Sequence, residues 1–323
     1  MTKVTIYSIA EELGVHASTV SRAFSRPELV KADVRQRVLE TAERLGFQPN
    51  RTARRLATGS TGAVGLLVPD ITNPFFPPLV RAIQAAAEEA TVILVDAEGA
   101  AAAEPSLIAR LRSQVDGILL ASPLATDEVL REAIGSTPTV VLNREIEGVA
   151  SVVCDMTSAL HAAGDHVHDL GHRRIALLAG TVGSWAADQR RMAIRMWAAG
   201  ADVELTELGP FDASYEGGRE AAEKLLATDT TAAFAFDDLT ACGVVAGLVE
   251  AGCRVPGDRS VIGCDDVLLA RVLTPTLSTV STPNERLAHV AMATLRAATT
   301  GDEATPSRLE GLFVPRQSTG RVA

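Results

Sequence analysis

The sequence predicts an α/β protein, with a small all-α head at the N-terminus and a two-lobed core of doubly wound parallel sheets behind it. Residues 1–60 show helical periodicity and carry ten Lys and Arg against six Asp and Glu, whereas the remaining residues carry 20 against 34. From residue 63 onward, near-continuous apolar runs alternate with amphipathic helices, which is typical of parallel sheets covered on both faces. These elements, about sixteen in number, exceed what one lobe of ordinary size holds, so we expect two lobes.

The head begins with two short helices around a tight turn, an arrangement typical of a helix-turn-helix. Gly14 supplies the backbone freedom that the sharp corner needs. Val15, Val20 and Phe24 are expected to pack against the first helix. The apolar face of that first helix is formed by residues spaced at i, i+3, i+4 and i+7, namely Ile6, Ile9, Ala10 and Leu13.

The second helix carries small and polar residues on surfaces that need not be buried. Short hydroxyls and one guanidinium are what a helix in the major groove would present to bases and phosphates. The basic character of the first sixty residues also fits nucleic-acid binding confined to one end of an acidic chain. The residues concerned are Ala17, Ser18, Thr19, Ser21 and Arg22.

A third helix is expected over 32–45, because Gly46 ends the pattern and Pro49 bars its continuation. A short basic segment, 50–58, follows and leads into a Gly/Ser/Thr linker. We therefore divide the chain into a head at 1–49, a hinge helix and linker at 50–61, and a core at 62–323.

The core is expected to alternate strands and helices, with any ligand bound beyond the carboxyl ends of the strands. Strands are predicted at 63–68, 92–95, 117–120, 139–142, 151–154, 174–179, 232–236 and 260–264. Helices are predicted at 79–89, 104–112, 127–133, 157–170, 188–199, 217–227, 238–251 and 284–298.

Other features argue for a cytoplasmic protein without catalytic chemistry. No apolar run is long enough to span a membrane, and the N-terminus lacks the apolar stretch of a signal peptide. The four cysteines form no CxxC pair, so we expect reduced thiols, no disulfide and no zinc. The histidines at 161, 166, 168 and 172 do not share one helical face, and catalytic motifs such as GxSxG, HExxH or a P-loop are absent from the sequence. We expect no catalytic residue, no metal and no cofactor.

The chain resembles the lactose-repressor (LacI/GalR) family of bacterial transcription regulators almost from end to end. The head and hinge carry TIYSIAEELGVHASTVSRAF and VRQRVLETAERLGFQPNRTARRLATG, and the core opens with VGLLVPDITNPFFPPLVRAI. Later landmarks are LGHRRIALLAG, AFAFDDLTACGVV, VPGDRSVIGCDD and TPTLSTV. The resemblance implies a periplasmic-binding-protein-like core, with one lobe at about 62–155 plus 284–311 and the other at about 156–282 plus 312–323.

The same resemblance implies a repressor that binds a near-palindromic DNA operator as a homodimer and responds to a small-molecule effector between the lobes. Base reading falls to Ala17, Ser18 and Arg22, and Arg22 is the best physical candidate because its fork matches guanine O6 and N7. The phosphate contacts implied are Thr5, Tyr7, Thr19, Ser21 and Asn50.

Leu56 is the implied minor-groove wedge, which kinks the duplex at the centre of the operator, and Ala53 is small enough to allow close approach. An isolated hinge helix of this length is marginal in water, so we expect it to order only on DNA. One position departs from the family. His16 stands where a capping Ser is usual, and a histidine caps a helix poorly, so either Val15-His16 is accommodated otherwise or His16 itself contacts phosphate.

The effector contacts implied are Arg191, Phe211, Asp237 and Asp265, with Phe75 as a wall and Asn143 as an added polar group. Carboxylates, a guanidinium and aromatic rings suit a sugar or sugar derivative, and a nucleobase or nucleoside is the alternative. Asp237 stands where Asn is commoner, which disfavours acidic ligands unless Arg191 offsets its charge. A solute-binding protein without a regulatory role is the alternative function, and the basic head argues against it.

Overall fold

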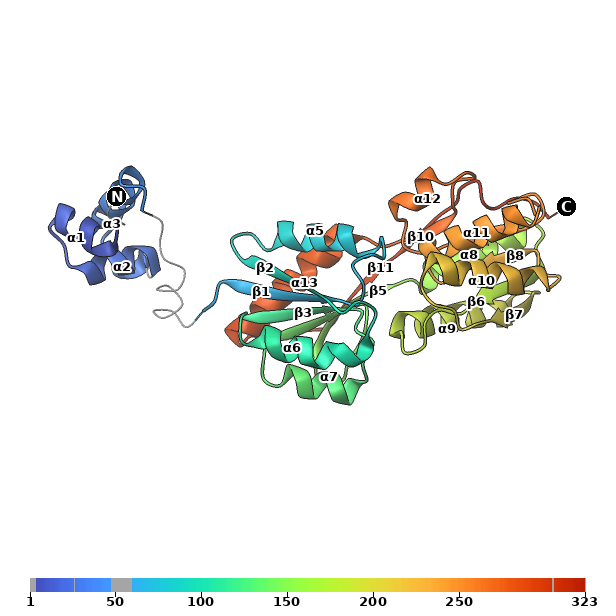
Figure 1. The fold of residues 1–323 in the computed structure, drawn as a ribbon, viewed down its shortest axis with the longest axis horizontal. Coiled ribbons are helices and arrows are strands. Elements are labelled where there is room, and N and C mark those ends of the chain that lie inside the picture. The colour runs from blue at the N-terminus through green and yellow to red at the C-terminus, as the bar shows by residue number, and fades with distance from the viewer. Residues whose placement is uncertain (1–3, 26, 48–59, 304, 323) are drawn as a thin grey trace. The chain divides into compact units, whose positions relative to one another are not determined.

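The computed structural model describes residues 4–25, 27–47, 60–303 and 305–322, and the chain divides into one unit before Ala63 and a second from Ala63 onward (Figure 1). The head is helical and the core has parallel sheets, so the predicted fold class is confirmed. Within the described ranges, no helix is both long and apolar enough to cross a bilayer.

In the described part of the head, helices α1 (Ile6–Leu13), α2 (Ala17–Ser25) and α3 (Ala32–Arg44) pack around a small apolar centre. Ile9, Val20 and Val38 come from successive helices and are fully buried together. The turn after α1 uses a left-handed residue, Gly14, with φ of 65°, and the amide of Val15 donates to the carbonyl of Ala10. These bonds satisfy the last carbonyls of α1 and turn the chain sharply into α2.

The first sheet of the core is entirely parallel, in the order β11-β5-β4-β3-β1-β2. Its strands are β1 (Ala63–Val68), β2 (Thr91–Asp96), β3 (Gly117–Ala121), β4 (Thr139–Leu142), β5 (Ala150–Asp155) and β11 (Ser307–Glu310). Helices α5 (Phe76–Ala86) and α13 (Asn284–Thr300) cover one face, and α6 (Glu104–Arg112) and α7 (Asp127–Ile134) cover the other (Figure 1). Every residue of β1, β3 and β4 is buried, which explains their continuous apolar sequences.

The second sheet is also parallel, in the order β7-β6-β8-β9. Its strands are β6 (Arg174–Leu178), β7 (Glu204–Leu208), β8 (Ala232–Phe234) and β9 (Ser260–Ile262). Helices α8 (Thr157–Asp169) and α9 (Trp185–Gly200) lie on one face, and α10 (Tyr215–Leu226) and α11 (Asp238–Glu250) on the other. Each sheet therefore has its own apolar layers.

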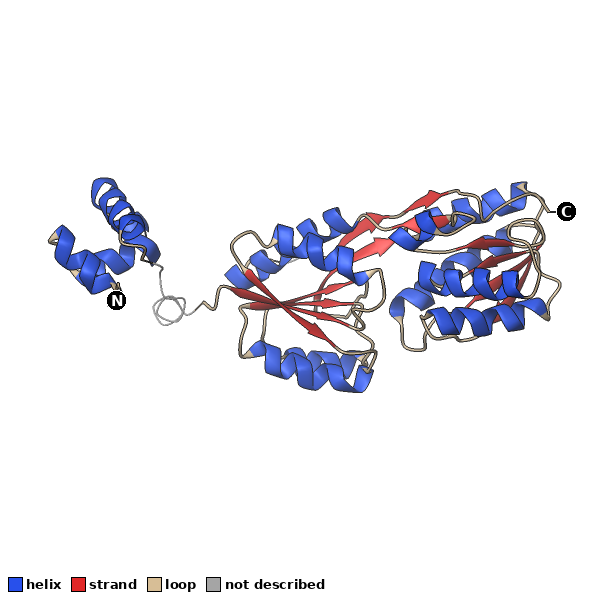
Figure 2. Cartoon of the chain, turned by 45° about the horizontal axis from the view of Figure 1, so that its top comes forward, coloured by secondary structure: helices blue, strands red, loops and turns tan. Residues whose placement is uncertain are grey.

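The chain passes between the two sheets at three places. It leaves β5 for α8, returns from β10 (Thr279–Ser281) to α13, and leaves β11 for β12 (Leu312–Val314). Strands β10 and β12 pair antiparallel, forming a two-stranded ribbon that continues from the first sheet toward the second (Figure 2). A short helix, α12 (Leu268–Val272), precedes β10.

Strand β7 was missed by the sequence reading. It is an edge strand that pairs only with β6, and its Glu204 and Glu207 side chains are exposed. Because solvent covers one side of such a strand, its sequence, ELTEL, lacks the apolar run that marks the buried strands.

Candidate ligand cavity and nucleic-acid surface

The head leaves its predicted DNA contacts accessible to varying degrees. Tyr7 is 71% exposed at the start of α1, Thr5 beside it is exposed, and Arg22 is exposed on α2. The other predicted contacts of α2 are half-buried: Ala17, Ser18, Thr19 and Ser21. Asn50, Ala53 and Leu56 lie outside the described residues.

His16 occupies the N-cap of α2, and its carbonyl accepts hydrogen bonds from the amides of Thr19 and Val20. Its ring nitrogen Nδ1 accepts from the backbone amide of Ser18 at 3.3 Å. The expectation of a poor cap is therefore corrected, because the imidazole Nδ1 occupies the position that a serine hydroxyl would take.

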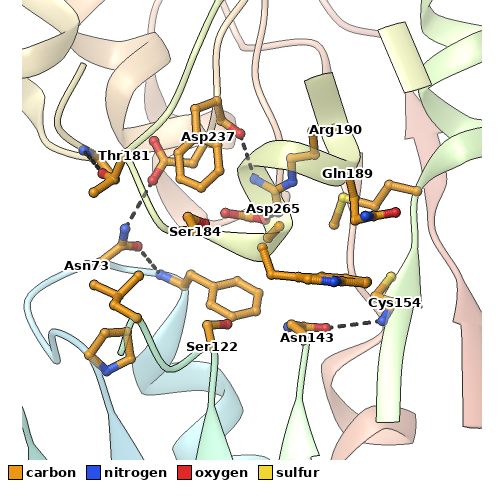
Figure 3. A pocket seen from close by; sticks show the side chains of 18 of the residues that line it. Asn73, Ser122, Asn143, Cys154, Thr181, Ser184, Gln189, Arg190, Asp237 and Asp265 are labelled. Carbon is orange, nitrogen blue, oxygen red and sulfur yellow. Dashed lines mark hydrogen bonds and ion pairs between the residues drawn. The ribbon is translucent and has the colours of Figure 1, made fainter. Parts of the chain in front are cut away.

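A cavity of about 400 Å³ lies where the carboxyl ends of the strands of both sheets face each other (Figure 3). Four of the predicted residues line it, each just after a strand or a short loop: Phe75, Asn143, Asp237 and Asp265. Sequence reasoning missed other lining residues: Asn73, Thr181, Ser184, Trp185, Gln189 and Arg190. This placement follows the rule that open α/β sheets bind ligands beyond the carboxyl ends of their strands.

Arg190 is the buried cation of the cavity. Its Nη2 donates to Oδ1 of Asp265 at 2.7 Å, and its Nη1 donates to the carbonyl of Phe236 at 2.6 Å. The guanidinium carbon also lies 4.9 Å from the centre of the Phe236 ring. Burial raises the pKa of Asp265 to about 7, against the opposing effect of Arg190. The neighbouring carboxylate of Asp237 contributes to the same rise.

Asp237 is 2% exposed and uses both carboxylate oxygens. Oδ1 accepts from the backbone amide of Thr240 at 2.7 Å, which caps the N-terminus of α11. Oδ2 accepts from Nδ2 of Asn73 at 3.0 Å, so a residue that follows β1 contacts one that follows β8 (Figure 3). Asp237 is thus both a helix cap and a wall of the cavity.

The next residue, Asp238, has a structural role behind the cavity. Its oxygens accept from the hydroxyl of Thr279 at 2.6 Å and from the amide of Val267 at 2.9 Å, which ties α11 to the segment around β10. Burial raises the pKa of Asp238 well above its usual range.

Two predicted effector contacts lie away from the cavity. Arg191 pairs with Asp188 at 2.7 Å on the outer surface of α9, with 41% of its side chain exposed. Successive residues of a helix point about 100° apart, so only one of two adjacent arginines faces the cavity, and Arg190 is that residue. Phe211 is 5% exposed but packs in the apolar layer between the second sheet and helices α10 and α11.

The charges around the cavity favour an uncharged or cationic ligand. Its lining contains two arginines, Arg190 and Arg308, and both pair with carboxylates. Arg308 binds Glu145 at 2.7 Å and Asp155 at 3.2 Å. The lining also includes Asp70, Asp212 and Asp237, so an anionic ligand would enter a negative field.

Comparisons with known proteins match both units. The family model "Bacterial regulatory proteins, lacI family" matches residues 5–50, and "Periplasmic binding protein-like domain" matches residues 164–319. The chain is 36% identical over 303 residues to catabolite control protein A of Priestia megaterium, covering 90% of this chain and 91% of that protein. It is 30% identical over 294 residues to the transcriptional repressor PurR of Vibrio cholerae, covering 88% of each.

Solved structures give the same likeness. The lac repressor dimer bound to operator and the anti-inducer ONPF aligns with a TM-score of 0.86 at 25% identity, covering 99% of this chain and 100% of that one. A LacI family transcriptional regulator from Enterococcus faecium with bound ribose aligns with a TM-score of 0.72 at 30% identity, covering 81% of this chain and 100% of that one.

Proposed function

The chain belongs to the LacI family of bacterial regulatory proteins, and on this premise we propose that it represses transcription as a homodimer on a near-palindromic operator, under the control of a small-molecule effector. One observation carries the proposal. A helix-turn-helix with an exposed Arg22 is joined to a core whose two parallel sheets enclose a polar cavity.

Two heads of a dimer would enter successive major grooves, with α2 as the reading helix. The fork of Arg22 suits guanine, whereas Ala17 and Ser18 add apolar contact and a weak hydrogen bond. Thr5, Tyr7, Thr19, Ser21 and Asn50 would contact phosphates, which orient the protein without specifying sequence. We propose that Leu56, with Ala53 beside it, wedges into the minor groove between the heads.

The effector is proposed to be a sugar or an uncharged sugar derivative in the cavity. Arg190, Asp265, Asn73 and Asn143 offer hydrogen-bonding groups, and Phe75 offers an aromatic wall. Oδ1 of Asn143 accepts from the amide of Cys154 at 3.1 Å, so the NH2 end is the end that can donate to a ligand. The cavity volume lies within the usual range of about 300–1,000 Å³ for small-molecule sites.

Regulation would follow from the three crossings between the sheets. We propose lobes at 62–155 plus 284–311 and at 156–282 plus 312–323, with the effector setting how closely they approach. An effector acts only through different affinities for the DNA-competent and DNA-incompetent states.

Selection of bound duplexes from a random library, with full-length protein at fixed salt, tests the function directly. We expect a two-fold symmetric motif with a central CG step. Failure to enrich any motif, with or without added sugars, would contradict sequence-specific repression.

A further inference from the structure

We propose that Asn73 and Asp237 form a bridge that holds the two lobes together in the absence of effector, and that the effector opens this bridge by inserting a hydroxyl group. The inference rests on the proposed role of the cavity as the effector site. Asn73 is thereby given a role that its place in the sequence does not indicate. The bridge also requires that the effector both donate and accept a hydrogen bond at this position.

The bridge spans the cavity, because Asn73 follows β1 of the first sheet and Asp237 follows β8 of the second. Their side chains point toward each other in Figure 3, with Nδ2 of Asn73 3.0 Å from Oδ2 of Asp237. The two residues are 164 positions apart in the chain, so the contact exists only while the two lobes are held close.

The orientation of the Asn73 amide is fixed by its second bond. Oδ1 of Asn73 accepts from the backbone amide of Phe75 at 3.0 Å, at the start of α5. The opposite end of the amide is therefore the NH2 group, which donates to Asp237. Asp237 uses its other oxygen for the Thr240 amide at the start of α11. Each residue thus uses one side-chain atom to bond the start of the helix that follows it, and the other atom to bond the residue on the opposite lobe.

The strength of the bridge comes from the charge and burial of Asp237. A hydrogen bond to an ionised group is stronger than one between neutral groups, and loss of access to water strengthens it further. The net free energy of such a hydrogen bond shifts the equilibrium between closed and open arrangements of the two lobes by roughly ten- to a hundredfold.

An effector that takes over the bridge must satisfy both of its ends. At that point it has to donate to the carboxylate of Asp237 and accept from the NH2 of Asn73. A hydroxyl group does both. A phosphate or carboxylate oxygen cannot donate to Asp237, and an ammonium group cannot accept from Asn73. We therefore assign a hydroxyl group of the effector to this position, and the carboxylates that line the cavity favour an uncharged compound.

Reversing the polarity of the bridge tests it without removing either helix cap. Asn73→Asp retains an oxygen for the Phe75 amide but sets a second carboxylate against Asp237. Asp237→Asn retains an oxygen for the Thr240 amide but sets one NH2 group against another. The double variant restores a donor and an acceptor, because Asn at 237 can donate to Asp at 73.

Asp70→Asn is the matched control. Asp70 also lines the cavity, but its carboxylate accepts from the backbone amide and hydroxyl of Thr72 in its own turn. The control therefore removes one negative charge from the cavity, as Asp237→Asn does, and leaves the bridge intact.

Amide hydrogen exchange is measured by mass spectrometry on the full chain of each variant and of the parent protein, at pH 7.5 without effector. We expect about tenfold faster exchange in segments 69–76 and 236–241 of each single variant. The double variant should exchange like the parent protein in both segments. The Asp70→Asn control should match the parent in segment 236–241, which lies away from the turn that Asp70 itself bonds. Single variants that match the parent, or a double variant as fast as the single ones, would overturn the bridge.

Global unfolding of a single variant would show as fast exchange in β3 as well, and recovery in the double variant would then still support the bridge. Ribose, xylose, glucose and galactose, each beside its phosphate ester, probe the effector class. We expect protection of both segments by a neutral member of this set. Protection by phosphate esters, or by none of these compounds, would overturn the class. Operator binding of the parent protein is measured separately, so failure of the proposed function remains distinguishable.

Discussion

Nδ1 of His16 lies 2.8 Å from Oγ of Ser18 at the start of α2. The same nitrogen also accepts from the Ser18 backbone amide at 3.3 Å, so the hydroxyl and the amide of Ser18 share one acceptor. A hydroxyl that donates to His16 presents its lone pairs outward and can then read only a donor on a base or sugar. The histidine at position 16 therefore bears on the capping of α2 and on the base contact that we propose for Ser18.

Replacement of His16 by Ala should weaken the start of α2 by about 1 kcal/mol, because an N-cap acceptor is lost. Amide exchange of residues 17–20 in the full chain measures this effect. His16→Asn restores an acceptor and should recover the protection. Unchanged exchange in the Ala variant would show that the imidazole does not cap the helix.

Arg22→Ala should relax base preference at one position of each half-site, at a cost of about 1–3 kcal/mol on the preferred base. Selection from a random duplex library measures the change in the motif. Arg37 is an exposed arginine on α3, and Arg37→Ala is the control for loss of charge alone. An identical motif for Arg22→Ala and the parent would refute the reading role.

Leu56→Ala should lower operator affinity by ~10-fold or more, because the kinked minor groove loses its apolar wedge. Affinity for random duplex should change little, since non-specific binding depends on phosphate contacts. Titrations of both duplexes at the same salt concentration provide the comparison. Equal losses on the two duplexes would argue against a wedge.

Arg190→Lys should weaken effector binding about tenfold, because lysine keeps the charge but lacks the planar fork that binds Asp265 and the Phe236 carbonyl. Arg191→Lys makes the same chemical change on the outer surface of α9 and should leave effector binding unchanged. Effector titrations of the two variants compare them directly. A larger loss for Arg191→Lys would reverse the assignment.

The contribution of His172 to stability should fall as the pH is lowered below about 6.5, the ordinary pKa of histidine. Burial lowers the pKa of His172 in the folded protein, and that of His166 in the same direction. As the pH falls, the histidines of the unfolded chain therefore take up protons at a higher pH than those of the folded protein. The stabilisation that is fully present above about pH 6.5 is lost progressively until the pH reaches the folded-state pKa. Denaturant unfolding between pH 7.5 and 5.5 measures this loss as the difference between the parent protein and His172→Gln, because the raised pKa of Asp265 acts in the opposite direction in both proteins.

His172→Gln should remove that contribution to the pH dependence while lowering stability at pH 7.5. His172 is 1% exposed and bonds Thr231, Ser260 and the carbonyl of Gly320, and glutamine replaces these bonds only in part. His289→Gln, at an exposed position on α13, should leave the slope unchanged. A slope that survives His172→Gln in full would assign it to other groups.

The fold class followed from local patterns, which is why it could be predicted. Buried strands such as β3 need continuous apolar residues, and Gly14 marks a turn that requires a left-handed residue. Sequence order also places Asp237 and Asp265 after strands, where a parallel sheet collects its functional residues. Edge strand β7 lacked such a pattern because solvent, rather than a helix layer, meets part of its surface.

The helix-turn-helix head, the alternation of strands and helices, and the family can be predicted from the amino-acid order, because each depends on patterns of contiguous residues. How the helices pack in three dimensions decided that Arg190 faces the cavity while Arg191 faces solvent, since a one-residue shift rotates a side chain by about 100° around a helix. It also decided that Phe211 belongs to a core layer and that Asn73 meets Asp237. Contacts across 164 residues depend on how two sheets approach, and no local pattern in the sequence encodes that distance.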